Sequence, residues 1–189
     1  MPELIEILCE EHRNIEKLLL VLEREFDVFG RREQPDYEVV QSVIGYFKEY
    51  PDRCHHPKED MLYDRLKVRN PDVAEIVGDI EADHQHGAQR LRRVAQAVDS
   101  VLGGEEVMRE TVNATIHDFI ERERRHIAME EGILFPAALR TLRREDWAEI
   151  DARWNDETDP LFGKTTQEKY QLLRERILQW EREAEAERP

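Results

Sequence analysis

Cysteine is scarce in this sequence, which has only Cys9 and Cys54 among its 189 residues. Two thiols are too few for a disulfide scaffold, and without a CxxC pair they do not predict a zinc site built on thiolates. Glycine and proline are also scarce, at eight residues each, whereas 38% of the residues are charged. This composition is typical of long, solvated helices rather than of short strands and turns. We therefore expect an all-α protein.

Positive charge is scarce relative to negative charge. The chain has 28 Lys and Arg residues against 43 Asp and Glu residues, which gives a formal net charge of −15. Such a chain repels phosphate backbones and anionic lipids, so we expect neither nucleic acid nor a membrane as a partner. No apolar run approaches the length that spans a bilayer, and the first thirty residues lack the features of a secretory signal. The expected location is the cytoplasm.

Apolar residues recur at alternating spacings of three and four along four long segments, which indicates amphipathic helices. These segments run from Pro2 to Phe29, from about Asp36 to Leu66, from Val73 to Val98 and from about Glu105 to Leu142. A short piece at Glu145 to Arg153, a loop from Asn155 to Lys164 and a last helix around Tyr170 to Trp180 follow. We predict an up-down-up-down four-helix bundle over residues 1–143, and over 144–189 a helical extension that packs on the bundle or mediates a homodimer.

Prolines and glycines indicate where two of these segments depart from an ideal helix. Pro51 and Pro57 lie inside the second segment, where each removes a backbone hydrogen bond, and we expect two collinear pieces there. Gly132 and Pro136 are expected to bend the last turns of the fourth segment. The apolar residues that share one face of a segment form its seam, and the seam predicted for this fourth segment includes Met108 and Ile133.

Histidines and glutamates replace apolar residues in these seams, and they do so twice at matched spacing. The first hairpin carries a histidine, then 43 residues later a second histidine with a glutamate four residues beyond it, and the second hairpin repeats this arrangement with a separation of 42 residues. The residues are, in chain order, His12, His55, Glu59, His84, His126 and Glu130. Two such hairpins packed about a pseudo-two-fold axis bring both sets to the middle of a bundle.

A metal site accounts for these polar residues. Residues four apart share a helix face, so His55 with Glu59, and His126 with Glu130, can each reach one centre. Burying an imidazole and a carboxylate is costly unless both find a partner, and a metal cation satisfies both. Four histidines and two glutamates can hold two metals. Imidazole and carboxylate without thiolate suit iron, manganese or zinc, and a carboxylate-bridged pair in a helical bundle favours iron.

The pattern H, HxxxE, H, HxxxE resembles the hemerythrin-like HHE domain family over roughly Glu3 to Leu142. The strings CHHPKEDMLY at 54–63 and HIAMEEGILFPAA at 126–138 are similar to the second- and fourth-helix motifs of that family. The resemblance implies that the four histidines are terminal ligands of two non-haem irons and that Glu59 and Glu130 bridge them. It also implies a small ligand such as oxygen, nitric oxide or peroxide.

Two positions differ from the oxygen-carrying members of the family. Ala88 stands where they have a further histidine, and His126 is followed by Glu130 where they end in HxxxxD. The resemblance therefore points to the bacterial branch associated with nitric oxide, oxygen or peroxide chemistry, redox sensing or iron handling. His56 is a candidate fifth histidine, because a distortion of the helix at Pro57 can turn it toward one metal. The other histidines, at 86 and 117, are expected to face away from the site.

Three functions stay open at this point. The first is a redox-active diiron protein; the sequence shows no separate nucleophile and identifies no redox partner, so it does not predict whether a substrate is turned over. The second is a non-catalytic metal sensor or store that acts through the C-terminal helix. The third is a metal-free bundle whose histidines bond to the glutamates. Cys9 and Cys54 are interpreted as packing residues, with a thiol pair that oxidises on iron loss as the alternative.

Overall fold

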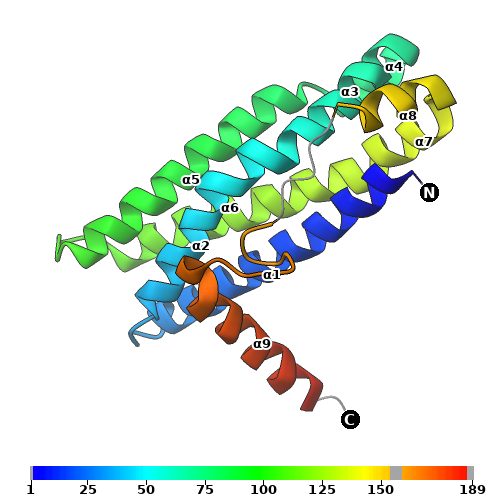
Figure 1. Ribbon diagram of the computed structural model, residues 1–189. Coiled ribbons are helices and arrows are strands. Elements are labelled where there is room, and N and C mark those ends of the chain that lie inside the picture. The colour runs from blue at the N-terminus through cyan, green and yellow to red at the C-terminus, as the bar shows by residue number, and fades with distance from the viewer. Residues whose placement is uncertain (1, 154–158, 187–189) are drawn as a thin grey trace.

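The computed structural model describes residues 2–153 and 159–186, which are helical apart from the connecting turns (Figure 1). The predicted loop from Asn155 to Lys164 thus lies partly outside the described residues. In chain order the elements are α1 (Glu3–Gly30), α2 (Tyr37–Tyr50), η1 (Pro51–His55), α3 (His56–Arg69), α4 (Pro71–Val77), α5 (Ile80–Leu102), α6 (Arg109–Met129), η2 (Glu130–Leu134), α7 (Phe135–Thr141), α8 (Arg144–Asp151), η3 (Glu168–Tyr170) and α9 (Gln171–Ala186).

Four antiparallel columns make the bundle, as predicted: α1, then α2 with η1 and α3, then α5, then α6 with η2 and α7 (Figure 1). Side-chain caps set where several of these helices begin. Asp36 accepts a hydrogen bond from the Val39 amide at 3.2 Å at the start of α2, and Asp79 accepts one from the Ala82 amide at 3.0 Å at the start of α5. Each cap satisfies an amide that has no partner within its helix.

The third predicted segment was wrong in one respect, because it is two helices rather than one. Gly78 ends α4 with a φ of 82°, a conformation that favours glycine, and Asp79 then caps α5. Two residues predicted for the seam of the fourth segment were also wrong, since Met108 is 74% exposed and Ile133 is 38% exposed. Met108 precedes the first turn of α6, and Ile133 lies in η2, where the wider turn rotates the side chains away from the α-helical register.

The core consists of two apolar clusters. The larger cluster includes Leu18, Val43, Val94, Phe119 and Leu173, and the smaller cluster includes Leu4, Leu62, Ile80, Leu134 and Ile150. Each column of the bundle passes from one cluster to the other at its histidine or glutamate of the internal repeat. In α1, Leu8 belongs to the smaller cluster and Ile15 to the larger one, and His12 lies between them. A polar layer therefore divides the core in the middle of the bundle.

The C-terminal extension packs on the bundle at two places. Arg69 of α3 donates two hydrogen bonds, both 2.9 Å long, to Asp146 of α8. Further on, Tyr170, Leu173 and Ile177 add to the larger cluster, and α9 then runs away from the bundle (Figure 1). Ile150 of α8 belongs to the smaller cluster, so both α8 and the start of α9 contribute to the core.

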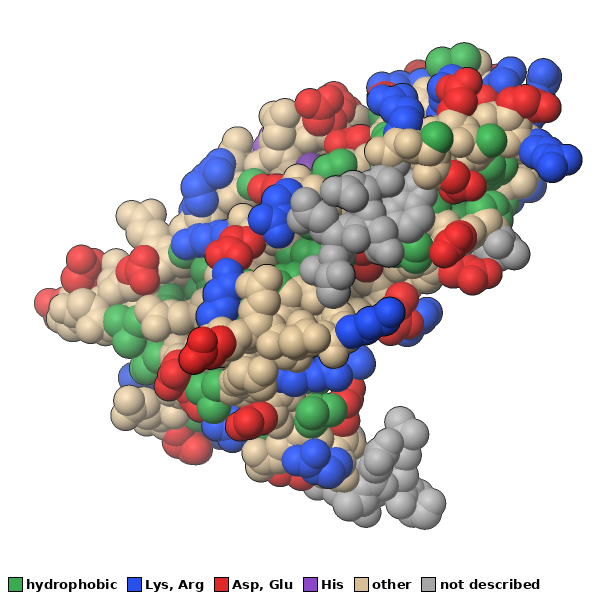
Figure 2. All heavy atoms as spheres, viewed as in Figure 1, with side chains coloured by type: hydrophobic (Ala, Val, Ile, Leu, Met, Phe, Trp, Pro, Cys, Tyr) green, Lys and Arg blue, Asp and Glu red, His purple; other side chains and the backbone are tan. Residues whose placement is uncertain are grey.

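The surface mixes charges of both signs. Figure 2 shows acidic and basic side chains interspersed over the visible face, and the histidines show there only as small patches. No helix within the described ranges has the length and apolar character that crossing a membrane requires.

Candidate metal centre

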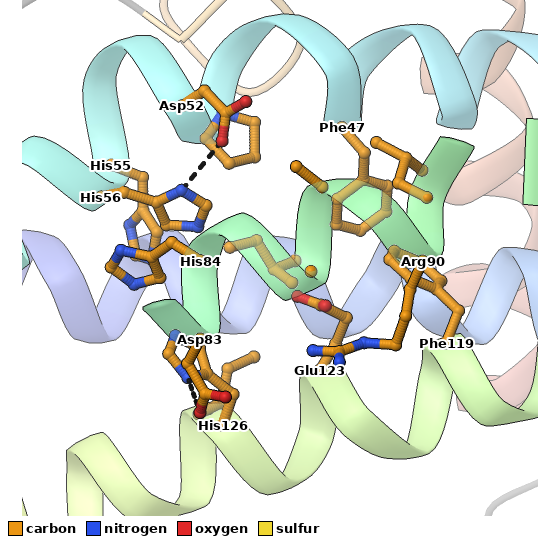
Figure 3. Close-up of a pocket in the computed structure, with 16 residues that line it drawn as sticks. Phe47, Asp52, His55, His56, Asp83, His84, Arg90, Phe119, Glu123 and His126 are labelled. Atoms are coloured by element: carbon orange, nitrogen blue, oxygen red, sulfur yellow. Dashed lines mark hydrogen bonds and ion pairs between the residues drawn. The ribbon is translucent and has the colours of Figure 1, made fainter. Parts of the chain in front are cut away.

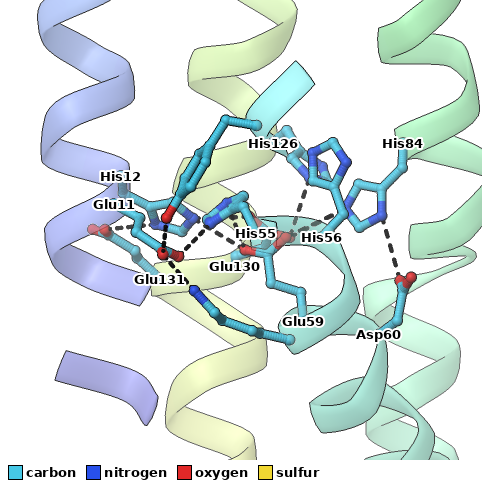
Figure 4. Close-up of polar contacts among 12 residues, drawn as sticks. Glu11, His12, His55, His56, Glu59, Asp60, His84, His126, Glu130 and Glu131 are labelled. Carbon is cyan, nitrogen blue, oxygen red and sulfur yellow. Dashed lines mark hydrogen bonds and ion pairs between the residues drawn. The ribbon is translucent and has the colours of Figure 1, made fainter. Parts of the chain in front are cut away.

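Six side chains converge in the polar layer; Figure 3 shows several of the histidines from one side and Figure 4 shows the polar contacts. Their ligand atoms form two groups, each with all atoms within 4.8 Å of one another. One group is His12, His55 and Glu59, and the other is Glu59, His84, His126 and Glu130. Because Glu59 belongs to both groups, they are two halves of a single site. These are the six residues that the duplicated spacing predicted.

Glu59 aims one carboxylate oxygen at each half. Its Oε1 lies 3.1 Å from Nε2 of His12 and 3.2 Å from Nε2 of His55. Its Oε2 lies 3.4 Å from Nε2 of His84 in the other half. A carboxylate that faces two groups of donors through its two oxygens has the orientation of a bridging ligand.

Glu130 repeats this arrangement from the opposite column. Its Oε2 lies 3.4 Å from Nε2 of His12, whereas its Oε1 lies 3.1 Å from Nε2 of His126 and 3.9 Å from Nε2 of His84. Both glutamate side chains are fully buried. The two carboxylates therefore lie between the two histidine pairs.

Several of these buried atoms have no hydrogen-bond partner among the described residues. They are Oε2 of Glu59, both oxygens of Glu130 and Nε2 of His84 and His126. Buried polar atoms without a partner are costly, and a cation between them would satisfy all of them. Donors bound at about 2.1 Å and at right angles on one ion lie about 3.0 Å apart, close to the separations observed here. The residues thus fit two metal ions bridged by two carboxylates.

A second layer of carboxylates lies behind the histidines, with one near each Nδ1. The pairs are His12 with Glu131 at 3.0 Å, His55 with Glu11 at 2.9 Å, His84 with Asp60 at 3.4 Å and His126 with Asp83 at 3.6 Å. The hydrogen bonds at Nδ1 of His12 and His55 fix these rings so that Nε2 faces the centre and make each imidazole a stronger ligand, whereas Asp60 and Asp83 act on His84 and His126 at ion-pair distance. The sequence reasoning missed this layer entirely.

The outer carboxylates follow one rule. Each is the chain neighbour of one of the six central residues, as Glu11 is of His12, and each supports a histidine on another column. Neighbouring helix residues differ by about 100° around the axis, so the second residue of such a pair faces the adjacent helix when the first faces the centre. An acidic residue beside four of the six predicted ligands is the only trace of this layer in the sequence, and it is too common a feature to identify the layer by itself.

Glu11 is the most embedded of the outer carboxylates. Its Oε1 accepts hydrogen bonds from the Tyr50 hydroxyl at 2.8 Å and from Nζ of Lys58, and its Oε2 is bonded to Nδ1 of His55. Burial raises the pKa of Glu11, but His55 and Lys58 outweigh burial and lower it overall. Glu11 therefore stays charged inside the bundle.

The electrostatic field of the centre favours positive charge. Burial lowers the pKa of His12, but hydrogen bonds to Glu130 and Glu59 outweigh burial and raise it to about 11. The pKa of His126 rises to about 10, again because nearby carboxylates outweigh burial. Burial and Glu59 raise the pKa of Glu130, yet the histidines around it lower it to about 2. Such a site attracts cations, and protons compete with metal for the same nitrogens.

Both π-helical turns of the described chain lie at this centre, since η1 ends at His55 and η2 begins at Glu130. Each is followed two residues later by a proline, Pro57 or Pro136, which has no N–H to donate to the residue four positions back. The bends predicted at these prolines are therefore wider turns within continuous columns. Turns of this kind recur at functional sites.

His56 lies beside the centre but outside the two groups of converging atoms. Its ring stacks on His84 with centroids 3.9 Å apart, and its Nδ1 lies 3.1 Å from Asp52, as Figure 3 shows. Its assignment as a fifth ligand stays a prediction. His86 is exposed and His117 is half-buried, and neither belongs to the groups.

The two cysteines lie on opposite sides of the polar layer. Cys54 is buried in the larger cluster, whereas Cys9 packs against the smaller one. This arrangement favours the interpretation of both as packing residues over that of a thiol pair.

A cavity of about 40 Å³ adjoins the half that contains His84 and His126 (Figure 3). Its walls include both of these histidines, His55 and His56, and the apolar side chains of Ile15, Phe47, Leu91, Phe119 and Ile127. A water molecule needs about 10–15 Å³ of such space, so the cavity has room for a diatomic molecule or peroxide. No pattern in the sequence indicated this cavity.

Comparison with known proteins agrees with the geometry. The family model described as Hemerythrin HHE cation binding domain matches residues 3–138. No curated protein and no solved structure matches the chain significantly. The matched range contains all six converging side chains and ends within α7.

Proposed function

The chain belongs to the hemerythrin HHE cation-binding domain family, and from this premise we propose that it holds two iron ions and binds or reacts with a small ligand such as oxygen, nitric oxide or peroxide. One observation carries the proposal: Glu59 and Glu130 each aim one oxygen at each histidine pair. Donor sets of imidazole and carboxylate suit iron, with manganese and zinc as the expected substitutes.

Bound iron would supply one-electron chemistry and an open position for a small ligand. The chain's own residues do the remainder. Each histidine pair would hold a metal from two neighbouring columns, the glutamates would balance its charge, and the outer carboxylates keep the imidazole rings oriented. His56 is proposed as a further ligand on the side of His84, where its ring already lines the cavity.

The cavity determines which ligands can approach. Both histidines of the half with His84 and His126 line it, and its other walls combine apolar side chains with the charged side chains of Asp52, Asp83, Arg90 and Glu123. At about 40 Å³ it admits a molecule of a few atoms, whereas a large molecule does not fit. This supports a diatomic molecule or peroxide as the ligand.

The test is elemental analysis of anaerobically purified protein, followed by its absorption spectrum during exposure to oxygen, nitric oxide and peroxide. The expected result is about two irons per chain, as in other paired-carboxylate bundles, with bands that respond to the ligands. Bound iron whose bands ignore all three ligands would instead favour a metal store or sensor. The absence of stoichiometric metal after anaerobic reconstitution with ferrous iron would contradict the proposal.

A further inference from the structure

Arg90 of α5 lies in the wall between the ligand cavity and a groove on the surface. It lines the cavity of about 40 Å³ beside His84 and His126. It also lines an open groove of about 460 Å³ between α5 and α6, together with Arg93 and with residues of α6 that include Thr111, Thr115 and Asp118. Of the described residues, only Arg90 lines both spaces. Its side chain therefore separates the space beside the metal centre from a space that is open to solvent.

Glu123 of α6 lies at the same end of the cavity. Figure 3 shows its carboxylate and the Arg90 guanidinium on the side of the cavity away from His56. A Cβ added at Gly87 would lie 3.2 Å from Oε1 of Glu123 and 3.9 Å from Nη2 of Arg90, so both charged ends lie over the same turn of α5. Burial raises the pKa of Glu123, and the positive charges of His126 and Arg90 oppose this rise. The carboxylate thus attracts the guanidinium across the gap between α5 and α6.

The glycine at position 87 leaves room for this pair of side chains. Gly87 lies in the interior of α5, where glycine costs about 1 kcal/mol relative to alanine. An alanine methyl group there would require the Glu123 carboxylate to shift. This end of the cavity therefore has space that helix propensity alone would not provide.

The two ends of the cavity differ in how firmly their side chains are held. At one end, Nδ1 of His56 lies 3.1 Å from Oδ1 of Asp52, and the His56 ring stacks on His84 with centroids 3.9 Å apart. At the other end, Nε of Arg90 is buried without a hydrogen-bond partner among the described residues. Moving Arg90 breaks no hydrogen bond at this nitrogen, whereas moving His56 loses both its stacking and its contact with Asp52.

We propose that small ligands enter the metal centre from the groove between α5 and α6, past the side chain of Arg90, whose displacement sets the rate of entry. The proposal rests on the proposed function, because it assigns a path to the same ligand. Arg90 blocks the path by its bulk, and Glu123 holds the guanidinium in the blocking position. Neither residue belongs to the two groups of converging ligand atoms, so both act on entry rather than on metal binding.

An entrance of this kind selects ligands by size. Molecules of many sizes reach the open groove, but only those that pass the displaced guanidinium reach the cavity. Nitric oxide and hydrogen peroxide require a smaller displacement of Arg90 than a branched hydroperoxide does. Entry is therefore expected to be fast for the two small ligands and slow for a bulky one, and this difference depends on residue 90.

The first test measures the binding of nitric oxide to ferrous iron-loaded protein by stopped-flow absorption. Arg90→Ala removes the blocking side chain, and we expect the association rate to rise by about tenfold. Arg93→Ala is the matched control, because it removes the same charge from the groove and leaves the cavity wall intact. Iron content is expected to stay unchanged in both variants. An association rate in Arg90→Ala equal to that of Arg93→Ala and the unmodified protein would overturn the proposal.

Arg90→Met separates bulk from charge. Methionine keeps an unbranched side chain in the path but carries no charge, so nitric oxide is expected to bind at nearly the rate of the unmodified protein. Binding as fast as in Arg90→Ala would contradict the assignment of the barrier to the bulk of the side chain.

The expected size selection is tested with two peroxides. Hydrogen peroxide and tert-butyl hydroperoxide are each mixed with iron-loaded protein, and the change in iron absorption is followed. Arg90→Ala is expected to accelerate the reaction of tert-butyl hydroperoxide severalfold more than that of hydrogen peroxide. Equal acceleration of both would overturn the role of Arg90 in size selection.

A last test does not depend on iron chemistry. The protein is loaded with cobalt(II), and the binding of azide is followed by stopped-flow absorption. Azide is expected to bind severalfold faster in Arg90→Ala than in Arg93→Ala, in which the same charge has been removed. Equal rates of azide binding would overturn the entrance. If azide binds faster in Arg90→Ala while the iron-loaded protein ignores oxygen, nitric oxide and peroxide, the proposed function fails and the entrance stands.

Discussion

The two halves of the metal centre carry equivalent ligands in different surroundings. Glu11 precedes His12 and supports His55, just as Asp83 precedes His84 and supports His126. The side chain of Glu11 is 9% exposed and lies 2.9 Å from its histidine, whereas that of Asp83 is 55% exposed and lies 3.6 Å away.

This difference continues around the centre. The first half is tied to Tyr50 and Lys58 through Glu11 and contributes only His55 to the cavity wall, whereas both histidines of the second half line the cavity. Closely matched ligand spacing therefore produces one more closed half and one more open half. Access to a metal is determined by what surrounds the ligands, and this is information that the ligand motif itself does not contain.

The largest expected effect comes from breaking both halves together. Glu59→Gln removes the charge of the carboxylate that faces both histidine pairs, so we expect both metals to be lost. The accompanying loss of free energy of unfolding is about 3 kcal/mol for each metal, or ~5 kcal/mol for both, when free metal exceeds each dissociation constant about a hundredfold. Elemental analysis and thermal unfolding with and without iron measure both effects. Glu75→Gln, at an exposed position of α4, is the control, and two metals retained in Glu59→Gln would contradict the bridging role.

The comparison of the halves is tested directly by the pair Glu11→Gln and Asp83→Asn. Glu11 accepts three charge-assisted or buried hydrogen bonds, so its substitution is expected to lower the free energy of unfolding by about 3 kcal/mol. Asp83 is mostly exposed, and its substitution should change stability by less than about 1 kcal/mol. Urea unfolding of both variants provides the measurement. Equal losses of free energy of unfolding in the two variants would show that the two halves do not differ in how firmly their outer carboxylates are held.

The stability of the metal-free protein should depend on pH through the histidines and glutamates of the centre. Folding raises the pKa of His12 and His84 from 6.5 to about 11, so their contribution to stability is full below about pH 6.5 and is lost as the pH rises through about 11. Folding lowers the pKa of Glu130 from 4.5 to about 2, so its contribution is present above about pH 4.5 and is lost as the pH falls through about 2. The metal-free chain should therefore be most stable between about pH 4.5 and 6.5.

Metal loading displaces protons from the same histidines and so becomes stronger as the pH rises. The difference in melting temperature between loaded and metal-free protein is expected to grow from about pH 6 to about pH 9. Calorimetry at several pH values measures it, with His86→Ala as the control because His86 is exposed and outside the centre. A difference independent of pH would contradict proton competition at the ligands.

The six central residues were predictable because helical periodicity leaves little choice. A histidine in an apolar seam with a glutamate four residues on must face the core, and the repetition of this set in two hairpins brings both sets together. The outer carboxylates were not predicted, because only the packing of the columns decides which histidine Glu11 or Asp83 meets. Residue adjacency alone is too common to indicate such a contact.

The π-helical turns and the break at Gly78 illustrate two kinds of missed feature. Pro57 and Pro136 indicated where backbone hydrogen bonds are missing, but whether a helix then breaks or widens depends on the side chains packed around it. The break before α5 was readable, since Gly78 followed by Asp79 is a helix end followed by an N-cap. The helical spacing of apolar residues continued from Val77 to Ile80 across this break, and it therefore suggested one helix.

The smallest expected effect concerns only the open half. Gly87 lines the cavity, and a Cβ there would lie 3.2 Å from Oε1 of Glu123, whose flexible end must shift. Gly87→Ala should therefore slow the binding of nitric oxide to iron-loaded protein a few-fold, as measured by stopped-flow absorption, because the shifted carboxylate narrows the cavity. Stability should change by no more than about 1 kcal/mol, since alanine favours the helix.

Gly45→Ala separates the two effects of this substitution. Gly45 lies within α2, where an added Cβ would have no neighbour within 4 Å, so the substitution gains the same helix propensity without touching the cavity. Its ligand-binding rate should equal that of the unmodified protein. If Gly87→Ala and Gly45→Ala bind nitric oxide equally fast, the ligand does not reach the metals along this side of the cavity.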